Sequence, residues 1–204
     1  MNDAQIRLSF HRKKLGRLHA APDTLVIDEL GLKHGKCRAD IAVINGHLIG
    51  YEIKSDGDTL RRLDEQVATY NAVFDFATVI IARRHLQNVK TLIPGWWGIT
   101  TAVKGQRGAI HFETVRRTTR NPSPDDFAVA QLLWRCEAEE ELLKRGVSGR
   151  FLRQKRSVLY RELVEILAPR ELRNTIRQRL KSRTDWRCPG PLSPSGDSYQ
   201  PCAM

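Results

Sequence analysis

The segment RADIAVINGHLIGYEIK, residues 38–54, predicts two β-strands joined by a tight turn. Apolar and β-branched residues fill both of its halves, Arg38–Ile44 and His47–Lys54, as is typical of strands. Asn45-Gly46 lies between them and favours a two-residue hairpin, because both turn positions tolerate positive φ. The segment therefore predicts an antiparallel hairpin in which the residues on either side of Asn45-Gly46 are paired.

This hairpin would bring acidic side chains together. It places Asp40 near Tyr51, and one residue of stagger would bring Asp40 beside Glu52. Side chains alternate along a strand, so Glu52 and Lys54 are expected to point to the same face. Two carboxylates with a lysine alongside could hold Mg²⁺ and activate a water molecule against a phosphodiester.

The alternative interpretation is a solvated, charged strand face, because an acidic residue followed by Glu-x-Lys is common by chance. The neighbouring residues are mostly apolar, however: Ala39 and residues 41–44 surround Asp40, and residues 49–53 do the same for Glu52. A carboxylate in a largely buried strand is costly unless it is paired or bound to a metal ion. We therefore expect both acidic residues to have specific partners.

The order of predicted elements indicates an α/β domain over residues 1–118. A helix over Ala4–Leu18 comes first, and Thr24–Leu30 suits either a strand or the end of a helix. After the hairpin, Asp58 is a candidate N-cap for a helix that continues to Phe74. The remaining expected elements are a strand over 76–82, a helix over 85–92, and strands over 97–103 and 109–115.

A second region, residues 119–187, is predicted to be helical and basic, with Asn121-Pro122 at the boundary. Apolar residues at intervals of three and four predict one amphipathic helix from Phe127 to Leu142, which ends near Gly146. Further helices are expected around residues 159–167 and from Pro169 onward. Pro, Ser and Gly dominate residues 188–204, which predicts a disordered tail.

The charge distribution points to a polyanionic partner. The chain has a formal net charge of +11, and residues 116–187 carry 18 Lys/Arg against 10 Asp/Glu, which gives +8. This excess favours nucleic acid, with DNA as the first expectation and RNA as the alternative. Six arginines recur about one helical turn apart, so several could line one face: Arg150, Arg153, Arg156, Arg173, Arg177 and Arg179. The alternative is a solvated arginine-rich surface.

Three short motifs resemble those of the PD-(D/E)XK nuclease superfamily. They are Arg38-Ala39-Asp40, Glu52-Ile53-Lys54-Ser55-Asp56 and Gln66-x-x-x-Tyr70, of which the last resembles a motif of the RecB-like branch. The second also resembles a small uncharacterised bacterial family and bacterial DNA-repair proteins. Ala39 replaces the proline that members carry before the first aspartate.

The resemblance covers residues 24–100 and implies a restriction-endonuclease-like fold, with a mixed central sheet flanked by helices and followed here by the helical region. It also implies a nuclease that hydrolyses DNA phosphodiesters with Mg²⁺, for which Mn²⁺ could substitute, in DNA repair or defence. The alternatives are a catalytically weak or inactive nucleic-acid-binding protein with this fold, and an adaptor that binds an acidic protein.

The resemblance further implies roles for individual residues. Asp40 and Glu52 would bind the metal ion together with the backbone carbonyl of Ile53, and Lys54 would orient or deprotonate the attacking water. Glu29 would add a further carboxylate, unless it is a surface or capping residue.

Supporting roles fall on the helix that follows the hairpin. Gln66 and Tyr70 are four residues apart and share one helix face, where they would hold Glu52 and Lys54 or bind phosphate. Tyr70 could instead be a core residue. Arg62 precedes Gln66 by one turn and would contact a phosphate or form a surface salt bridge.

No apolar run in the sequence is long enough to cross a bilayer, and the N-terminus lacks the pattern of a signal peptide. We therefore expect a cytoplasmic protein without a membrane partner. The four cysteines show no C-x-x-C spacing, so the sequence supports no zinc site. The oligomeric state stays open.

Overall fold

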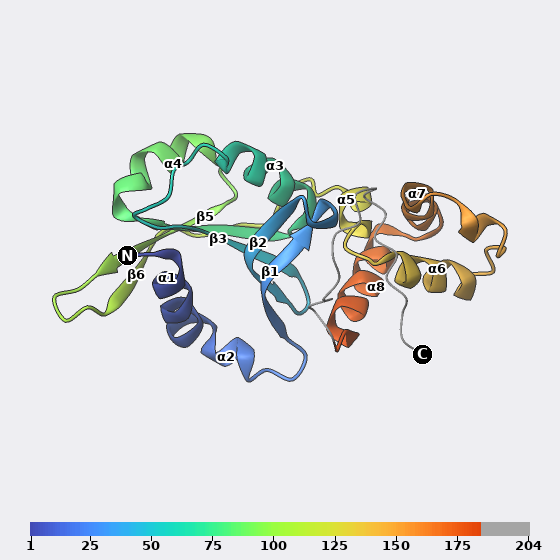
Figure 1. Ribbon diagram of the computed structural model, residues 1–204, viewed down its shortest axis with the longest axis horizontal. Helices are drawn as coiled ribbons and strands as arrows, with labels where there is room; N and C mark the ends of the chain where they lie inside the picture. The colour runs from blue at the N-terminus through green and yellow to red at the C-terminus, as the bar shows by residue number, and fades with distance from the viewer. Residues whose placement is uncertain (185–204) are drawn as a thin grey trace.

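A six-stranded mixed sheet forms the centre of the computed structural model, which describes residues 1–184 (Figure 1). The strands lie side by side in their order along the chain. Neighbours are antiparallel except β3–β4 and β4–β5, which are parallel. The strands are β1 (Leu25–Leu32), β2 (Cys37–Ile44), β3 (Leu48–Lys54), β4 (Phe76–Ala82), β5 (Gly98–Lys104) and β6 (Ile110–Arg116).

Helices cover both faces of this sheet (Figure 1). On one face lie α3 (Leu63–Val73) and α4 (Leu86–Leu92); on the other lie α1 (Asp3–Phe10) and α2 (Gly16–His19), joined by a π-helical turn. Each face has its own hydrophobic cluster. One cluster packs Ile6 and Phe10 of α1 against Ile41 and Ile53, and the other packs α3 against the opposite side chains of β2–β5. The predicted α/β class, with its mixed sheet and flanking helices, is confirmed.

The hairpin differs from its prediction by one residue. Ile44 pairs with Leu48 and Ile41 with Tyr51, so the loop has three residues, 45–47, instead of two. Within this loop, the Asn45 side-chain oxygen accepts a hydrogen bond from the backbone N–H of His47 at 3.0 Å. This contact favours the longer loop, and the resulting register places Asp40 one residue beyond Ile41 and therefore beside Glu52.

Two further local predictions need correction or completion. Asp58 does not cap α3, which begins at Leu63 with Arg62 at its N-cap. The Asp58 carboxylate instead accepts hydrogen bonds from the backbone N–H and the hydroxyl of Ser55, at 2.7 and 2.6 Å, and closes the turn after β3. The ambiguous segment over residues 24–30 is a strand, β1.

The C-terminal region is helical, as predicted, but the helix expected from Phe127 to Leu142 is broken. The turn over residues 131–134 buries Leu132 and Leu133. Its backbone carbonyls accept hydrogen bonds from Tyr160 and Arg183, at 2.7 and 2.8 Å, and these distant donors stabilise the break. The helices are α5 (Asp126–Ala130), α6 (Arg135–Lys144), α7 (Arg156–Ile166) and α8 (Pro169–Ser182).

The helical region shares the hydrophobic cluster of the α3 face, which includes side chains from α5 to α8. In Figure 1, α8 lies between the sheet and the pair α6 and α7. The domain boundary near residue 118 stays a prediction, and the predicted disordered tail, 188–204, lies outside the described residues. Within residues 1–184, no helix has the length and apolar character to span a membrane.

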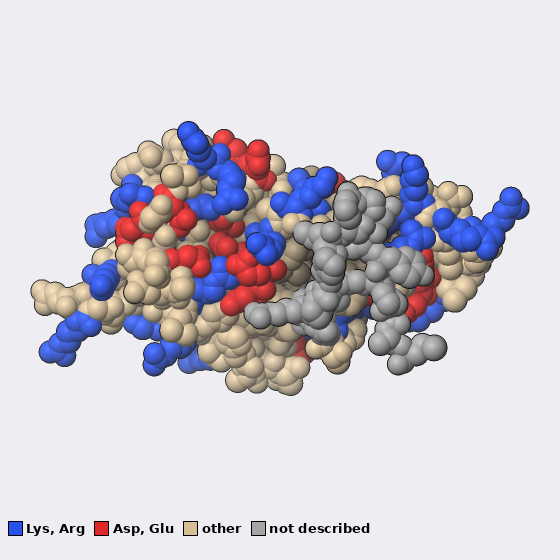
Figure 2. All heavy atoms as spheres, in the orientation of Figure 1, with Lys and Arg blue, Asp and Glu red and all other residues tan. Residues whose placement is uncertain are grey.

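Two of the six arginines that were expected to contribute to a basic face are held in ion pairs. Arg179 is ion-paired with Glu140 and Glu141, and Arg173 with Asp75 and Asp126. Figure 2 shows that the face in view is mixed, with acidic side chains over the sheet interspersed among basic ones. The formal charge of residues 116–187 therefore overstates the charge that is free for a partner.

Candidate functional site

Four side chains singled out in the sequence meet on the face of the sheet that α3 covers. Lys54 Nζ donates hydrogen bonds to Glu52 Oε1 at 2.6 Å and to Gln66 Oε1 at 2.9 Å. Gln66 Nε2 donates to Glu52 Oε1 at 2.5 Å, and the Tyr70 hydroxyl donates to Glu52 Oε2 at 2.7 Å. We call these four residues the Glu52 cluster. The structure brings them into direct contact, and their functional roles stay predictions.

The periodicities of β3 and α3 produce the Glu52 cluster. Glu52 and Lys54 are two residues apart on a strand and share a face, while Gln66 and Tyr70 are one turn apart on a helix. The side chains of Glu52 and Lys54 are 1% and 9% exposed. A buried ion pair loses favourable hydration, which the hydrogen bonds from Gln66 and Tyr70 partly offset. Tyr70 is fully buried, so it is part of the core as well as of the cluster.

Asp40 lies beside the Glu52 cluster, where the β2–β3 ladder ends. Its Oδ2 accepts a hydrogen bond from the backbone N–H of Ile53 at 2.6 Å. Its Oδ1 accepts one from Arg7 at 3.3 Å, and Arg7 also donates to the backbone carbonyl of Asp40 at 2.6 Å. Ile53 thus contributes its N–H to Asp40, and a contact of its carbonyl with a cation stays a prediction.

The carboxyl group of Asp40 is unusually weakly acidic. Burial and the nearby charge of Glu52 raise its pKa to about 7, although the N–H of Ile53 and the Arg7 guanidinium act in the opposite direction. Burial also raises the pKa of the Tyr70 hydroxyl well above its usual value. Asp40 is therefore partly protonated near neutral pH, while Tyr70 remains a hydrogen-bond donor.

Arg7 of α1 completes the site and carries no local sequence signal. Its guanidinium lies 2.8 Å from Glu29, 3.2 Å from Asp3 and 3.3 Å from Asp40. Glu29 has a φ of 57° within β1, a region that residues with side chains seldom adopt, and it also pairs with Arg38 at 3.3 Å. Asp3 is one turn away on α1, but Glu29 and Asp40 come from β1 and β2, so the place of Arg7 in the site could be identified only from the tertiary structure.

A cleft of about 570 Å³ opens beside these residues. Glu29, Asp40 and Gln66 contribute to its lining, and Arg62 stands exposed at its rim. Its other lining residues are Lys33, Gly35, Lys36, Cys37, Arg38, Glu65, Ala68 and Thr69. We call this space the carboxylate cleft. Glu52, Lys54 and Ile53 contact residues that line it, and Tyr70 contacts Glu52, so the sequence motifs converge at one place.

The donors already present around Asp40 and Glu52 bear on the predicted Mg²⁺ ion. Each of the four carboxylate oxygens accepts at least one hydrogen bond from the protein. Within residues 1–184, no group of three or more acidic, histidine or cysteine side chains is arranged to hold a metal ion. As folded, the carboxylates are satisfied by protein donors, with Arg7 as the cation at Asp40. A metal ion at Asp40 would therefore compete with Arg7, and Mg²⁺ or Mn²⁺ binding stays a prediction.

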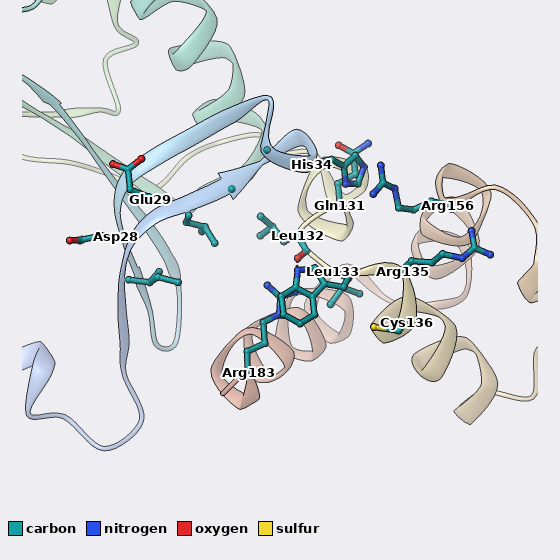
Figure 3. Close-up of a pocket in the computed structure, with 15 residues that line it drawn as sticks. Asp28, Glu29, His34, Gln131, Leu132, Leu133, Arg135, Cys136, Arg156 and Arg183 are labelled. Carbon is teal, nitrogen blue, oxygen red and sulfur yellow. Dashed lines mark hydrogen bonds between the residues drawn. The ribbon is translucent and has the colours of Figure 1, made fainter. Parts of the chain in front are cut away.

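A second cleft, of about 350 Å³, lies between β1 and the helical region (Figure 3). Asp28 and Glu29 stand on one side of it, and Arg135 and Arg156 on the other. Partial burial, with Arg156 and Lys36 nearby, lowers the pKa of His34 to about 4. Glu29 lines both this cleft and the carboxylate cleft, so the two spaces adjoin at β1.

The chain is similar to a phage protein and to a solved structure. Protein cII of Enterobacteria phage P4 is 26% identical over 156 residues, which are 76% of this chain and 56% of that protein. The chain thus spans little more than half the length of this relative. Among solved structures, the SPO1766 protein of unknown function from Silicibacter pomeroyi is 17% identical, with a TM-score of 0.39 over 66% of this chain and 88% of that one.

The family described as bacteriophage P4 protein cII matches residues 12–187, which include the sheet, the carboxylate cleft and the C-terminal helices. Neither that description nor the name of the phage relative indicates an enzyme. Assignment to the PD-(D/E)XK superfamily is therefore wrong, and so is the metal-dependent DNA hydrolysis, in repair or defence, that it implied. The match extends over most of the chain, and the protein belongs to the bacteriophage P4 cII family.

Proposed function

We propose that the protein binds nucleic acid, in the first place DNA, along the carboxylate cleft. The observation that carries this proposal is the basic rim of the cleft. Lys33, Lys36 and Arg62 line it and are exposed, and their side chains form no ion pair or hydrogen bond within residues 1–184. Unpaired lysine and arginine side chains at the edge of a cleft are suited to contact phosphates. The net charge of +11 favours the approach of any polyanion.

The acidic floor of the cleft must be neutralised for a phosphate to come close. Glu29 and Asp40 would repel it, and Arg7 supplies a positive charge between them. A Mg²⁺ or Mn²⁺ ion that displaced Arg7 would serve the same purpose, because hard cations bind carboxylate and phosphate oxygens together. We propose that Asp40 and Glu52 bind such an ion and that the ion assists nucleic-acid binding.

Fluorescence anisotropy with labelled duplex DNA, single-stranded DNA and RNA tests the proposal. The full chain should bind DNA with an affinity that falls steeply with salt, because each phosphate contact releases counterions. Lys36→Gln/Arg62→Gln should weaken binding and reduce the salt slope by about two. The matched control is Lys14→Gln/Lys90→Gln, which removes two exposed charges outside every cleft described above and should bind as the wild type does.

Other outcomes assign the cleft differently. Preference for RNA over both forms of DNA would keep the site and change the nucleic acid. Equal losses in the cleft variant and its control would show that overall charge, and not the cleft, accounts for the binding. Absence of salt-dependent binding to any of the three nucleic acids would contradict the proposal and favour an acidic protein as the partner.

A further inference from the structure

A groove rich in arginine lies at the opposite end of β3 from the Glu52 cluster. Two adjoining clefts, of about 590 and 380 Å³, share Asp75, Arg120 and Arg173. The larger is also lined by His47, which directly precedes β3, and by Arg170 and Arg177 of α8. We call the joined space the arginine groove. Since β3 advances about 3.3 Å per residue, it lies on the order of 20 Å from Lys54.

Arg173 is held in place at the base of this groove. It donates hydrogen bonds to Asp75 at 3.4 Å and to Asp126 at 2.5 Å. Asp75 is itself fixed, because its other oxygen accepts the backbone N–H of Leu48 at 2.9 Å. These two carboxylates therefore orient one guanidinium. Asp75 links α8 to the starts of β3 and β4, and Asp126 links α8 to α5.

The other three arginines are available for a ligand. Within the described part of the chain, the side chains of Arg120, Arg170 and Arg177 form no hydrogen bond and no ion pair. Arg170 and Arg177 are seven residues apart on α8, with Arg173 between them, so all three lie along one helix face. Arg120 comes from the segment after β6, where the next residue, Asn121, donates its backbone N–H to the Asp75 carbonyl at 2.8 Å.

The charges of the groove are unbalanced. Four arginines line its larger cleft against one aspartate, whereas the carboxylate cleft has four basic and three acidic side chains. Partial burial lowers the pKa of Arg177, and repulsion from Arg173 acts in the same direction, while Asp75 opposes it. Crowded guanidinium groups repel each other, and a bound anion would relieve this repulsion. The planar fork of arginine matches the geometry of a phosphate group.

We propose that the arginine groove is a second nucleic-acid site, which binds phosphates of the polynucleotide backbone through Arg120, Arg170 and Arg177. This inference rests on the proposed nucleic-acid binding and extends it to a groove that includes Arg173 and Arg177, two of the arginines whose spacing the sequence shows. The length of the groove favours a polymer over a single free phosphate. Arg170 and Arg177 are about 10 Å apart along the axis of α8, which exceeds the reach of one phosphate group.

The test compares double variants of the full chain with equal loss of charge. Arg170→Gln/Arg177→Gln should lower the affinity for a labelled 30-nucleotide strand by about tenfold or more and reduce the salt slope by about two. Arg150→Gln/Arg153→Gln removes two exposed arginines between α6 and α7, outside the groove, and should leave the affinity within about twofold of wild type. Arg173 is left intact because of its structural contacts. Arg120 is exposed and lies outside α8, so Arg120→Gln provides a second test of affinity if the double variant has a lowered melting temperature.

The outcomes separate this inference from the proposed function. If the groove variants bind normally while the Lys36→Gln/Arg62→Gln variant is impaired, the groove proposal is wrong and the carboxylate cleft stands. If the groove variants are impaired while the Lys36→Gln/Arg62→Gln variant binds normally, the groove proposal is supported and the proposed binding at the carboxylate cleft is wrong. If the wild type binds none of the nucleic acids, both fail. Saturable binding of inorganic phosphate that the Arg170→Gln/Arg177→Gln variant abolishes, with unchanged affinity for the 30-nucleotide strand, would make the groove a site for a small phosphate ligand and overturn the proposal.

Discussion

Lys54 and Glu52 form an ion pair of 2.6 Å that is almost entirely shielded from water. Both residues belong to β3, and the shared oxygen of Glu52 also accepts a hydrogen bond from Gln66. Charges in such a position depend on each other, because either one alone would be buried without a counter-charge. The pair is therefore a sensitive point for the stability of the whole fold.

Replacing Lys54 with Met should lower the free energy of unfolding by about 3 kcal/mol, because Glu52 would keep its charge without a cation. The double variant Glu52→Gln/Lys54→Met should recover much of this loss, since neither charge remains. Urea denaturation at neutral pH measures both values. A loss below about 1 kcal/mol for Lys54→Met would mean that the pair behaves like a surface salt bridge.

Asp40 should make the protein less stable as the pH rises. Its pKa in the folded state is about 7, above the ordinary value of 3.8, so between these values the folded state holds a proton that the unfolded state has lost. The free energy of unfolding therefore falls from about pH 4 to about pH 7. Asp40→Asn keeps an oxygen for the Ile53 N–H and removes this titration.

Urea denaturation at pH 5 and pH 8, with EDTA present, measures the effect of Asp40→Asn. Between pH 5 and pH 8, the free energy of unfolding should fall on the order of 2 kcal/mol more in the wild type than in the variant. If the free energy of unfolding changes equally in both proteins, the pKa of Asp40 is not raised in the folded state.

Removing Arg7 should strengthen metal binding if Asp40 is a metal ligand. Arg7→Met removes the cation that is ion-paired with Asp40 and Glu29, so Mn²⁺ should bind at least about tenfold more tightly. The electron paramagnetic resonance signal of free Mn²⁺ measures this affinity. Arg12→Met, also near the N-terminus and exposed, is the control. Circular dichroism checks that α1 remains folded. Equal Mn²⁺ affinity in wild type and Arg7→Met would exclude competition at this site.

Gly50 is required for close packing of α3 on the sheet. A Cβ atom at this position would lie 2.6 Å from two ring carbons of Phe74, and the ring is buried and cannot move freely. Gly50→Ala should therefore lower the free energy of unfolding by about 1–3 kcal/mol. Thermal denaturation checks this against Gly95→Ala, where a Cβ would meet no atom within 4 Å. Similar melting temperatures for the two variants would show that Phe74 adjusts without cost.

The periodic parts of the structure could be predicted from the sequence. Alternation along β3 gave the shared face of Glu52 and Lys54, and the four-residue spacing of Gln66 and Tyr70 gave their common helix face. The hairpin loop was one residue longer than expected, because the side chain of Asn45 bonds back to His47. Local patterns therefore predicted which residues meet, and a side-chain contact decided the register.

Long-range contacts account for what the sequence did not reveal. The break between α5 and α6 depends on Tyr160 and Arg183, which are distant donors to its carbonyls. Arg7 reaches Asp40 across 33 residues. The spacing of arginines predicted one basic face, but Arg173 turns inward because Asp75 and Asp126 attract it. The motif resemblance drew attention to residues that meet in the structure, but it led to the wrong family.

The sequential order of the strands bears on how the chain reaches its fold. Every strand pairs with the one made just before it, through a short connection where the pair is antiparallel and through a helical crossover at β3–β4 and β4–β5. With this order of strands, the sheet can grow strand by strand while the chain leaves the ribosome. The contact between Asp75 and Arg173 spans 98 residues and must await the synthesis of α8. Docking of α8 is then a late step, and the arginine groove exists only once α8 has been made.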